Sequence, residues 1–237
     1  MASLKTLSVL ALSAALANAH GHVSQIVADG VTYVGAIPHS VDPASPGWPA
    51  NNQDNGFVEP AAFSSPDIVC HKGATASAAY AKVAAGGTVT VTWNTWPESH
   101  LGPVIDYLAR CEPDCASANK ASLSFAKIQE SGLSGGTWAV DTLMANGNKW
   151  DIKIPSNVAP GKYVLRHEII ALHSGGQANG AQAYPQCINL EITGSGSVTP
   201  QGEPATAFYT PTDPGILFDL YKPDLVYPIP GPDLWRV

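Results

Sequence analysis

The sequence predicts an all-β protein: an immunoglobulin- or fibronectin III-like antiparallel β-sandwich with long loops. Three observations support this prediction. Apolar and polar residues alternate with period two along several short segments, as they do in half-buried strands. No long segment repeats with the helical period. Glycine and proline number 22 and 20, whereas only 13% of residues are charged, a composition typical of a rigid, loop-rich secreted β-protein.

The strands can be placed from this alternation. The first is expected at residues 23–28. The clearest is at residues 88–93, where Val89, Val91 and Trp93 share one face and threonines occupy the other. Further strands are expected at residues 104–109, 122–129, 150–154, 161–172 and 187–193. Glycine-containing pairs at residues 86–87, 146–147 and 160–161 mark turns. Short strands joined by such turns favour two packed antiparallel sheets.

Two long segments, residues 35–66 and 200–237, are rich in proline and lack the alternation. Loops of this length in a compact domain tend to carry function. The second segment contains the bulky side chains Phe208, Tyr209, Phe218, Tyr221, Tyr227 and Trp235. Because this is too much apolar surface for a chain free in solution, we expect the segment to wrap around the sandwich.

The first 19 residues have the pattern of a secretory signal peptide. Lys5 provides the positive region, residues 6–16 are apolar, and Ala17-Asn18-Ala19 is a small-x-small cleavage site. Cleavage after Ala19 would free the α-amino group of His20. A terminal histidine offers an amine and an imidazole nitrogen to the same metal ion. The sequence therefore predicts a secreted, extracellular protein that begins with a potential chelate.

The charge of the chain excludes some partners. The net charge is −7, from 12 lysines and arginines against 19 acidic residues, and loss of Lys5 leaves 11 − 19 = −8. A basic groove for nucleic acid is therefore not expected. No apolar run after the signal reaches membrane-spanning length, so no membrane partner is expected either.

Four cysteines allow three disulfide connectivities, and export makes disulfides the default. Cys111 and Cys115 flank a turn-like insert of three residues, which favours a local bridge. Cys70 would then pair with Cys187. A metal site through Cys70 and His71 is the alternative, which oxidising conditions disfavour because they remove thiolates.

Three of the seven histidines are candidates for chemistry. His20 is terminal, His100 lies in a loop before a strand, and His173 follows one. Gln182 and Tyr184 lie two positions apart, so they share a side if that stretch is extended. For His39, His71 and His167 the ordinary interpretation holds, a solvated or hydrogen-bonded ring. Spacing alone does not bring the candidates together.

Several motifs in sequence resemble those of one known family. They are the terminal His20-Gly21, SPDIVC at residues 65–70, WPESHLGPV at 96–104, LRHEIIALH at 165–173 and GAQAYPQC at 180–187. From His20 to about Pro232 the chain resembles fungal lytic polysaccharide monooxygenases of auxiliary activity family 9, formerly glycoside hydrolase family 61. Several motifs in the family's order are far more specific than any one of them.

The resemblance implies a single copper ion and a role for each candidate residue. His20 would bind copper through its amine and Nδ1, His100 through Nε2, and Tyr184 at a long axial distance. His173 and Gln182 would form an outer shell beside the face where oxygen reacts. Three nitrogens with a weak axial oxygen suit Cu(II). The resemblance also implies the bridges Cys70–Cys187 and Cys111–Cys115, in agreement with the spacing of the cysteines.

The implied activity is oxidative cleavage of a β-1,4-glucan such as cellulose by hydroxylation at C1 and/or C4. It requires an external electron donor and O2 or H2O2. We expect residues 20–237 to form a single catalytic domain, a monomer with no appended carbohydrate-binding module. A crystalline chain cannot enter a cleft, so contact is expected on a flat surface with aromatic rings. Tyr227 is the first candidate for this contact, and Tyr33 and Trp48 are weaker ones.

Two alternatives remain at this stage. A metal-independent endoglucanase needs two carboxylates roughly ~5–9.5 Å apart, for which Glu98, Asp106 and Glu168 are available. A non-catalytic secreted protein that binds copper or carbohydrate is the other alternative. His20-Gly21-His22 satisfies the amine-x-x-His pattern, which binds Cu(II) through deprotonated backbone amides, but this mode needs a flexible terminus.

Overall fold

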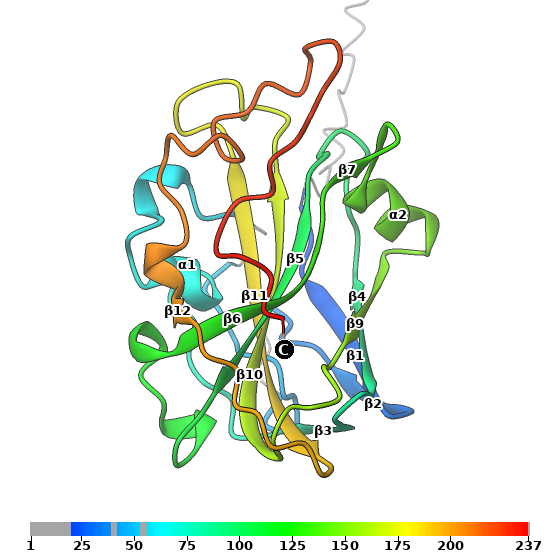
Figure 1. Cartoon of the computed structure of the whole chain (residues 1–237), viewed down its shortest axis with the longest axis vertical. Coiled ribbons are helices and arrows are strands. Elements are labelled where there is room, and N and C mark those ends of the chain that lie inside the picture. The colour runs from blue at the N-terminus through cyan, green and yellow to red at the C-terminus, as the bar shows by residue number, and fades with distance from the viewer. Residues whose placement is uncertain (1–19, 39–41, 53–55, 237) are drawn as a thin grey trace, which may run out of the picture.

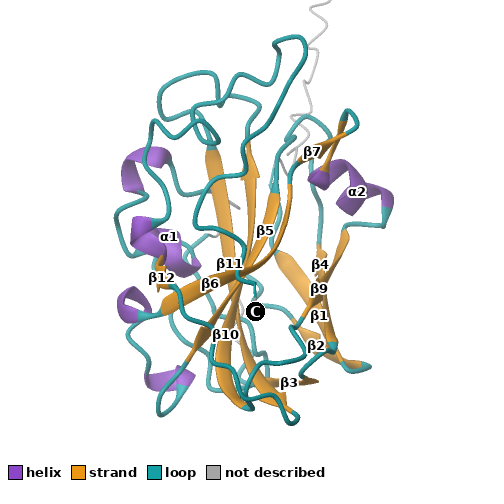
Figure 2. Ribbon diagram, in the orientation of Figure 1, coloured by secondary structure: helices purple, strands orange, loops and turns teal. Residues whose placement is uncertain are grey.

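A computed structural model describes residues 20–38, 42–52 and 56–236. The predicted signal peptide and His39 lie outside the described residues. Two β-sheets form the body of the molecule (Figure 1), and helices and long loops surround them (Figure 2). One continuous apolar cluster contains buried residues from both sheets, so the sheets pack face to face. The predicted β-sandwich is confirmed.

The smaller sheet has four strands in the order β2-β1-β4-β9, and every pair in it is antiparallel. Its strands are β1 (Val23–Ala28), β2 (Val31–Val34), β4 (Thr88–Trp93) and β9 (Lys149–Lys153). Alternate residues of β4 are buried, as the period-two pattern predicts. The sequence analysis did not predict β2, which is short and largely exposed at the sheet edge.

The larger sheet has six strands in the order β12-β6-β5-β10-β11-β3. Its strands are β3 (Ala81–Ala84), β5 (Val104–Arg110), β6 (Ser124–Ser131), β10 (Gly161–Ala171), β11 (Gln182–Thr193) and β12 (Glu203–Pro204). β10 and β11 pair over their whole length, from Gly161 opposite Ile192 to Ala171 opposite Gln182. The sheet is antiparallel except for β3, which runs parallel to β11, a departure from the purely antiparallel prediction.

The remaining elements are short. They comprise α1 (Asp67–Cys70), α2 (Ala139–Ala145), the hairpin of β7 (Leu133–Ser134) and β8 (Thr137–Trp138), and four 3-10 turns, η1 (Pro60–Ala62), η2 (Cys115–Ser117), η3 (Lys120–Ser122) and η4 (Ala205–Ala207). None of the described helices is long and apolar enough to cross a membrane.

A disulfide and hydrogen bonds from a buried arginine join α1 to the larger sheet. The disulfide Cys70–Cys187 joins α1 to β11, and Cys111–Cys115 closes a local loop after β5. Arg166 of β10 is fully buried. It donates to the carbonyls of Ile68 and Val69 at 2.8 and 2.9 Å and to both carboxylate oxygens of Glu168. A charge so deep is tolerable only when it is paired and hydrogen-bonded in this way.

The C-terminal segment wraps around the sandwich, as the sequence predicts. Its Trp235 amide donates to the Lys127 carbonyl at 2.8 Å, and Leu234 forms an isolated parallel β-bridge with Lys127. The buried ammonium of Lys127 donates to the Pro230 carbonyl at 3.0 Å and pairs with Glu130. Figure 1 shows this red segment crossing the face of the molecule over β6. The segment thus covers part of an otherwise open sheet edge.

Candidate metal centre

Sheet register brings the candidate residues to one end of the sandwich. β10 ends where β11 begins, because Ala171 lies opposite Gln182. β5 begins at the same end, with Val104 opposite Ile169. His173 follows β10, His100 precedes β5, and Gln182 and Tyr184 lie in β11. We call this end of the sandwich the histidine end.

The smaller sheet delivers His20 to the same place. β1 begins at Val23, opposite Trp93, and the chain runs from Trp93 into the loop that carries His100. His22 and Asn94 fix this start of β1 through paired hydrogen bonds of 2.8 and 3.0 Å. The His20 ring centroid lies 5.0 Å from that of His100 and 5.4 Å from that of Tyr184. The structure therefore brings His20, His100 and Tyr184 close together.

His100 presents a nitrogen without a partner. The residue is only 8% exposed, and its Nε2 is buried with no hydrogen bond among the described residues. Its Nδ1 lies 3.1 Å from Ser99 Oγ, and its carbonyl accepts from the Trp96 indole at 3.0 Å. A neutral ring with its proton on Nδ1 leaves the Nε2 lone pair available as a metal ligand.

Electrostatics favour this neutral form of His100. Burial lowers the pKa of its imidazole to about 4, helped by the nearby His173 and His20 rings. Burial, together with His20, also lowers the pKa of His173. A proton therefore competes weakly with a metal ion for these rings.

Tyr184 and Gln182 orient one another. The Tyr184 hydroxyl donates to Gln182 Oε1 at 2.7 Å, which fixes the amide so that its NH2 group points away from Tyr184. The Tyr184 oxygen keeps its lone pairs for another partner. Burial raises the pKa of this phenol, so it stays protonated and is a weak ligand. Both features agree with the roles that the resemblance implies.

The His173 ring lies against the His100 ring in a tilted arrangement. Their ring centroids are 3.9 Å apart at an interplanar angle of 32°. His173 Nδ1 is a second buried nitrogen without a partner in the described structure. Gln182 and His173 are both partly exposed, so they line the border between the histidine cluster and solvent.

The donor set fits copper. Among the described residues no three His, Cys, Asp or Glu side chains cluster as a metal site, so two imidazoles need a further donor. The α-amine that cleavage would create at His20 would supply a third nitrogen, and the His20 ring centroid lies 5.0 Å from that of His100. Three nitrogens without a carboxylate or thiolate suit copper better than calcium, magnesium or structural zinc.

Two aromatic residues enclose the cluster and were given no role from the sequence. Trp96 lies edge-on to Tyr184, with ring centroids 5.1 Å apart, and Phe57 lies 6.0 Å from His20. Trp96 was visible as part of the WPESHLGPV motif. Phe57 carried no signal, because its loop folds back only through the pairing of Val58 with Ala183.

The three predicted contact aromatics differ in position. Trp48 is 3% exposed and donates to Asn189 Oδ1 at 2.7 Å, so it packs in the core. Tyr33 contacts the backbone of Lys82 in β3, which pairs with the far end of β11. The structure thus does not bring Tyr33 to the histidine end.

Tyr227 is half-buried near the histidine end. Its ring packs against Trp138 and Phe218 with centroids 4.9 Å away in each case, and its hydroxyl donates to the Gly215 carbonyl at 2.8 Å. The residue therefore holds the C-terminal segment together, and only part of its ring can meet a ligand.

The carboxylates that a hydrolase needs are committed elsewhere. Asp106 is fully buried and accepts from His167 and Trp150 at 2.7 and 3.0 Å. Glu168 is fully buried against Arg166. Only Glu98 is exposed. No two of these three carboxylates can therefore flank a glycosidic bond, and they do not support the endoglucanase alternative.

The amine-x-x-His alternative conflicts with the backbone. The His22 amide donates to Asn94 Oδ1, whereas that mode needs this amide deprotonated and bound to copper. Gly21 packs so closely that a Cβ there would lie 2.1 Å from the Thr95 carbonyl. The terminus is thus held as the start of a strand and cannot wrap around an ion.

His71 and His167, for which the sequence predicts no role in chemistry, are hydrogen-bonded. His71 Nδ1 accepts from the Lys72 amide, and its Nε2 lies 2.9 Å from the Gly56 carbonyl. His167 binds Asp106 through Nδ1 and accepts from the Trp93 indole at 2.9 Å. With both cysteines at positions 70 and 187 oxidised, the Cys70–His71 metal site is wrong.

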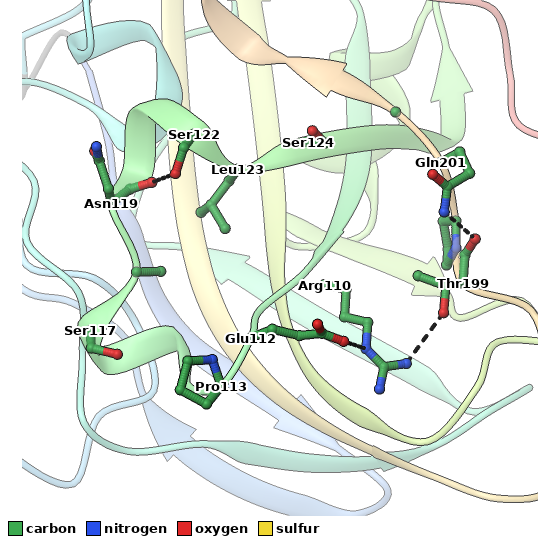
Figure 3. Close-up of a pocket in the computed structure, with 13 residues that line it drawn as sticks. Arg110, Glu112, Pro113, Ser117, Asn119, Ser122, Leu123, Ser124, Thr199 and Gln201 are labelled. Atoms are coloured by element: carbon green, nitrogen blue, oxygen red, sulfur yellow. Dashed lines mark hydrogen bonds and ion pairs between the residues drawn. The ribbon is translucent and has the colours of Figure 1, made fainter.

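A cavity of about 510 Å³ lies at the opposite end of the sandwich. Arg110, the last residue of β5, lines it and pairs with Glu112 at 2.9 Å (Figure 3). Since Arg110 lies opposite Tyr163 and Val104 lies opposite Ile169, this cavity is separated from the histidines by the length of β5. The cavity and the histidine cluster are therefore separate features.

Comparisons with known proteins agree on one family. The model of Auxiliary Activity family 9 (formerly GH61) matches residues 20–227. "AA9 family lytic polysaccharide monooxygenase F" of Malbranchea cinnamomea is 64% identical over 236 residues, covering 98% of this chain and 97% of that protein.

Solved structures give the same result. The extended catalytic domain of H. jecorina LPMO9A superposes with a TM-score of 0.88 at 50% identity, covering 91% of this chain and 90% of that one. A cellulose-active polysaccharide monooxygenase from M. thermophila superposes with a TM-score of 0.80 at 32% identity, covering 91% and 99%.

Proposed function

The chain belongs to auxiliary activity family 9, whose members are copper-dependent lytic polysaccharide monooxygenases, and on that premise we propose that its substrate is a β-1,4-glucan, cellulose first. One observation carries the assignment of the centre: His100 has a buried Nε2 without a hydrogen-bond partner among the described residues, and its ring centroid lies 5.0 Å from that of His20. The cellulose-active structural relative supports the choice of substrate.

Three residues would hold the copper ion. His20 would provide its amine and Nδ1, His100 its Nε2, and Tyr184 a weakly binding phenol oxygen. Bound copper supplies one-electron chemistry through which O2 or H2O2, with an external reductant, hydroxylates C1 or C4 of a glucose unit. The new hydroxyl then loses its proton as its oxygen becomes a carbonyl, the glycosidic C–O bond breaks, and the departing oxygen gains a proton.

His173 and Gln182 would act beside the metal and not on it. The bond from Tyr184 turns the Gln182 amide so that its N–H donors point away from the phenol. His173 offers a buried Nδ1 next to the His100 ring. Donors fixed before the reaction stabilise negative charge that develops on oxygen without reorganising, which is the role that we propose for this pair.

The enzyme would act outside the cell on an insoluble surface. Residues 1–19 would be removed as a signal peptide, and residues 20–237 would work as one monomeric catalytic domain. Tyr227 would contribute the exposed part of its ring to substrate contact at the histidine end.

Mass spectrometry of products from phosphoric-acid-swollen cellulose tests the proposal. The protein is produced with His20 as its first residue and incubated with copper, ascorbate and oxygen. We expect oligosaccharides that carry one added oxygen, or the hydrated lactone or ketone that follows from it. Addition of EDTA should abolish them. Unoxidised oligosaccharides that persist with EDTA would instead establish a hydrolase and overturn the proposal.

A further inference from the structure

A short segment of the chain joins the surroundings of the two histidines in the candidate centre. It comprises residues 94–100, which leave β4 after Trp93 and end at His100. We call it the bridging segment. Its first residues contact the backbone directly after His20, and its last residue is His100 itself. The conformation of the bridging segment therefore sets how far the His20 end of the chain lies from His100.

The bridging segment begins with a residue that binds His22 twice. Asn94 Oδ1 accepts from the His22 amide at 2.8 Å, and the Asn94 amide donates to the His22 carbonyl at 3.0 Å. These bonds continue the pairing of β1 with β4 past its last register pair, Val23 opposite Trp93. One of the two acceptors is a side-chain oxygen, so the contact depends on which residue stands at position 94.

Gly21 brings the terminal backbone against the same segment. A Cβ built on Gly21 would lie 2.1 Å from the Thr95 carbonyl oxygen and 2.8 Å from Asn94 Oδ1. Only glycine, which has no Cβ, permits a backbone approach this close. Gly21 is bonded directly to His20, so the contacts with Asn94 and Thr95 constrain the chain one residue from the proposed amine ligand.

Hydrogen bonds also hold the other end of the bridging segment. The His100 amide donates to the Pro97 carbonyl and the Trp96 indole donates to the His100 carbonyl, both at 3.0 Å. Directly after His100, the Leu101 carbonyl accepts from the Leu172 amide at 2.8 Å. His100 is thus fixed both within its own segment and to the chain that follows β10. The segment is anchored at each end and can hold the two histidines at one separation.

We propose that Asn94 is a positioning residue for the copper ion, because its bond to the His22 amide holds the His20 end of the chain where the metal also reaches His100. This role rests on the proposed function. Asn94 acts through the backbone of residues 21–22 and does not bind the metal itself. Without the Asn94 oxygen, copper binding must order the terminal residues, and the conformational entropy lost in that step weakens the affinity.

Isothermal titration calorimetry with Cu(II), on the protein that begins at His20, tests this role. Asn94→Ala should raise the dissociation constant about 10-fold, at the lower end of the range of about 10–100-fold for partners that orient metal ligands, since Asn94 is exposed and water can reach the vacated position. Asn94→Asp retains an oxygen acceptor for the His22 amide and should bind copper like the parent protein.

Asn157→Ala is the matched control for the loss of an amide side chain. Asn157 follows the end of β9 that lies away from the histidine end, since Lys153 is opposite Thr88 and Lys149 is opposite Thr92. This change should leave the copper affinity unaltered.

Amide hydrogen exchange of the metal-free protein gives a second measurement that needs no copper. Asn94→Ala should increase the exchange rate of the His22 amide, which loses its acceptor, while the amides inside β1 and β4 keep their protection. Asn94→Asp should restore slow exchange at His22. A double variant, Gly21→Ala with Asn94→Ala, should lose less copper affinity than the product of the two single losses, since both changes disturb the same backbone contact.

Unchanged copper affinity in Asn94→Ala, or an equal loss in Asn157→Ala, would overturn the positioning role. Loss of exchange protection throughout β1 and β4 in Asn94→Ala would also overturn it, because Asn94 would then stabilise the sheet rather than the terminus. The products distinguish this role from the proposed function. Oxidised oligosaccharides from the parent protein, with unchanged affinity in Asn94→Ala, refute only the positioning role. Copper affinity that depends on Asn94, without oxidised oligosaccharides, refutes only the function on glucan.

Discussion

Two histidines six positions apart show how differently one residue type is treated in this molecule. His167 lies inside β10, and His173 lies just past its end. In the core, both ring nitrogens of His167 have partners, Asp106 and Trp93. At the histidine end, His173 Nδ1 and His100 Nε2 are buried without any partner in the described structure.

The difference between the two histidines lies in whether their buried nitrogen atoms have hydrogen-bond partners. Leaving a buried polar atom unpaired costs about 1–3 kcal/mol, and protein cores rarely tolerate it. Two such atoms on neighbouring rings therefore indicate a ligand-binding site. The core network of Asp106, His167, Trp93 and Trp150 is equally rich in polar atoms, but it is complete. An unsatisfied nitrogen, and not the histidine itself, distinguishes the candidate site from the scaffold.

The largest expected effect is on copper affinity and comes from His100→Ala. This change removes one of three strong donors, and we expect an affinity loss of about 100-fold or more, since changes of outer partners alone cost about 10–100-fold. Isothermal titration calorimetry of the protein that begins at His20 measures it. The melting temperature of the metal-free protein should change little. An unchanged Cu(II) electron paramagnetic resonance spectrum in His100→Ala would falsify the assignment.

Next in size is the effect of the outer pair on rate. Gln182→Leu and His173→Ala each remove a fixed polar group beside the proposed metal and should slow release of oxidised oligosaccharides by about 10²–10³-fold. Copper affinity should stay near that of the parent protein. Tyr184→Phe would remove only a weakly binding phenol oxygen and should have a milder effect. If both Gln182→Leu and His173→Ala release oxidised oligosaccharides at the rate of the parent protein, these two residues have only a structural role in the loops.

A substitution in the core network should lower the stability of the fold and leave copper affinity unchanged. His167→Leu leaves the buried Asp106 without one donor and the Trp93 indole without an acceptor, so we expect a loss of about 3 kcal/mol in the free energy of unfolding. Guanidinium denaturation with the disulfides intact measures it. Copper affinity of the folded protein should be retained. His167→Gln keeps polar atoms in place and should lose less stability. If His167→Leu were as stable as the parent protein, the hydrogen bonds of His167 would not stabilise the core, and the contrast with the candidate site would be wrong.

The smallest effect is expected from the partly exposed ion pair of Lys162 and Asp114. Hydrogen bonds from Lys162 and then Tyr80 lower the pKa of Asp114 from 3.8 to about 2. A carboxyl whose pKa is lower in the folded state stabilises the protein above its unfolded pKa and loses that contribution as pH falls towards 2. Asp114→Asn should therefore lower the melting temperature slightly at pH 6 and not at all near pH 2. A constant difference across this range would show that the pair acts by packing instead.

Much of the sandwich could be predicted because its strands alternate cleanly. β1 and β4 match their predicted bounds, and β5 and β10 differ by one residue at their ends. β11 begins at Gln182, five residues before the prediction, and therefore includes Pro185. Proline is tolerated there since β3 pairs only with residues 190–193, so that side of β11 faces no neighbouring strand at Pro185.

Other differences come from short-range effects that periodicity cannot detect. β6 was expected from residue 122, but the Asn119 side chain accepts from the Ala121 amide and caps the turn η3, which delays the strand to Ser124. α2 has seven residues, too few for a helical repeat to stand out.

The candidate centre could not be derived from spacing at all. His20, His100 and Tyr184 meet only through the pairing of β1 with β4 and of β10 with β11. The resemblance to a family supplied their grouping in advance. It could not place Tyr33 or Trp48, whose surroundings depend on how this chain's own loops fold.

The central position of β10 has a consequence for the order of events as the chain emerges from the ribosome. β10 lies between β5 and β11, so the larger sheet cannot close before residue 193 has been synthesised. The candidate centre combines His20 with residues 173–184, and it is complete only after the larger sheet has formed. If this centre binds copper as proposed, binding would follow folding and would not drive it, and a truncated nascent chain would carry no complete site.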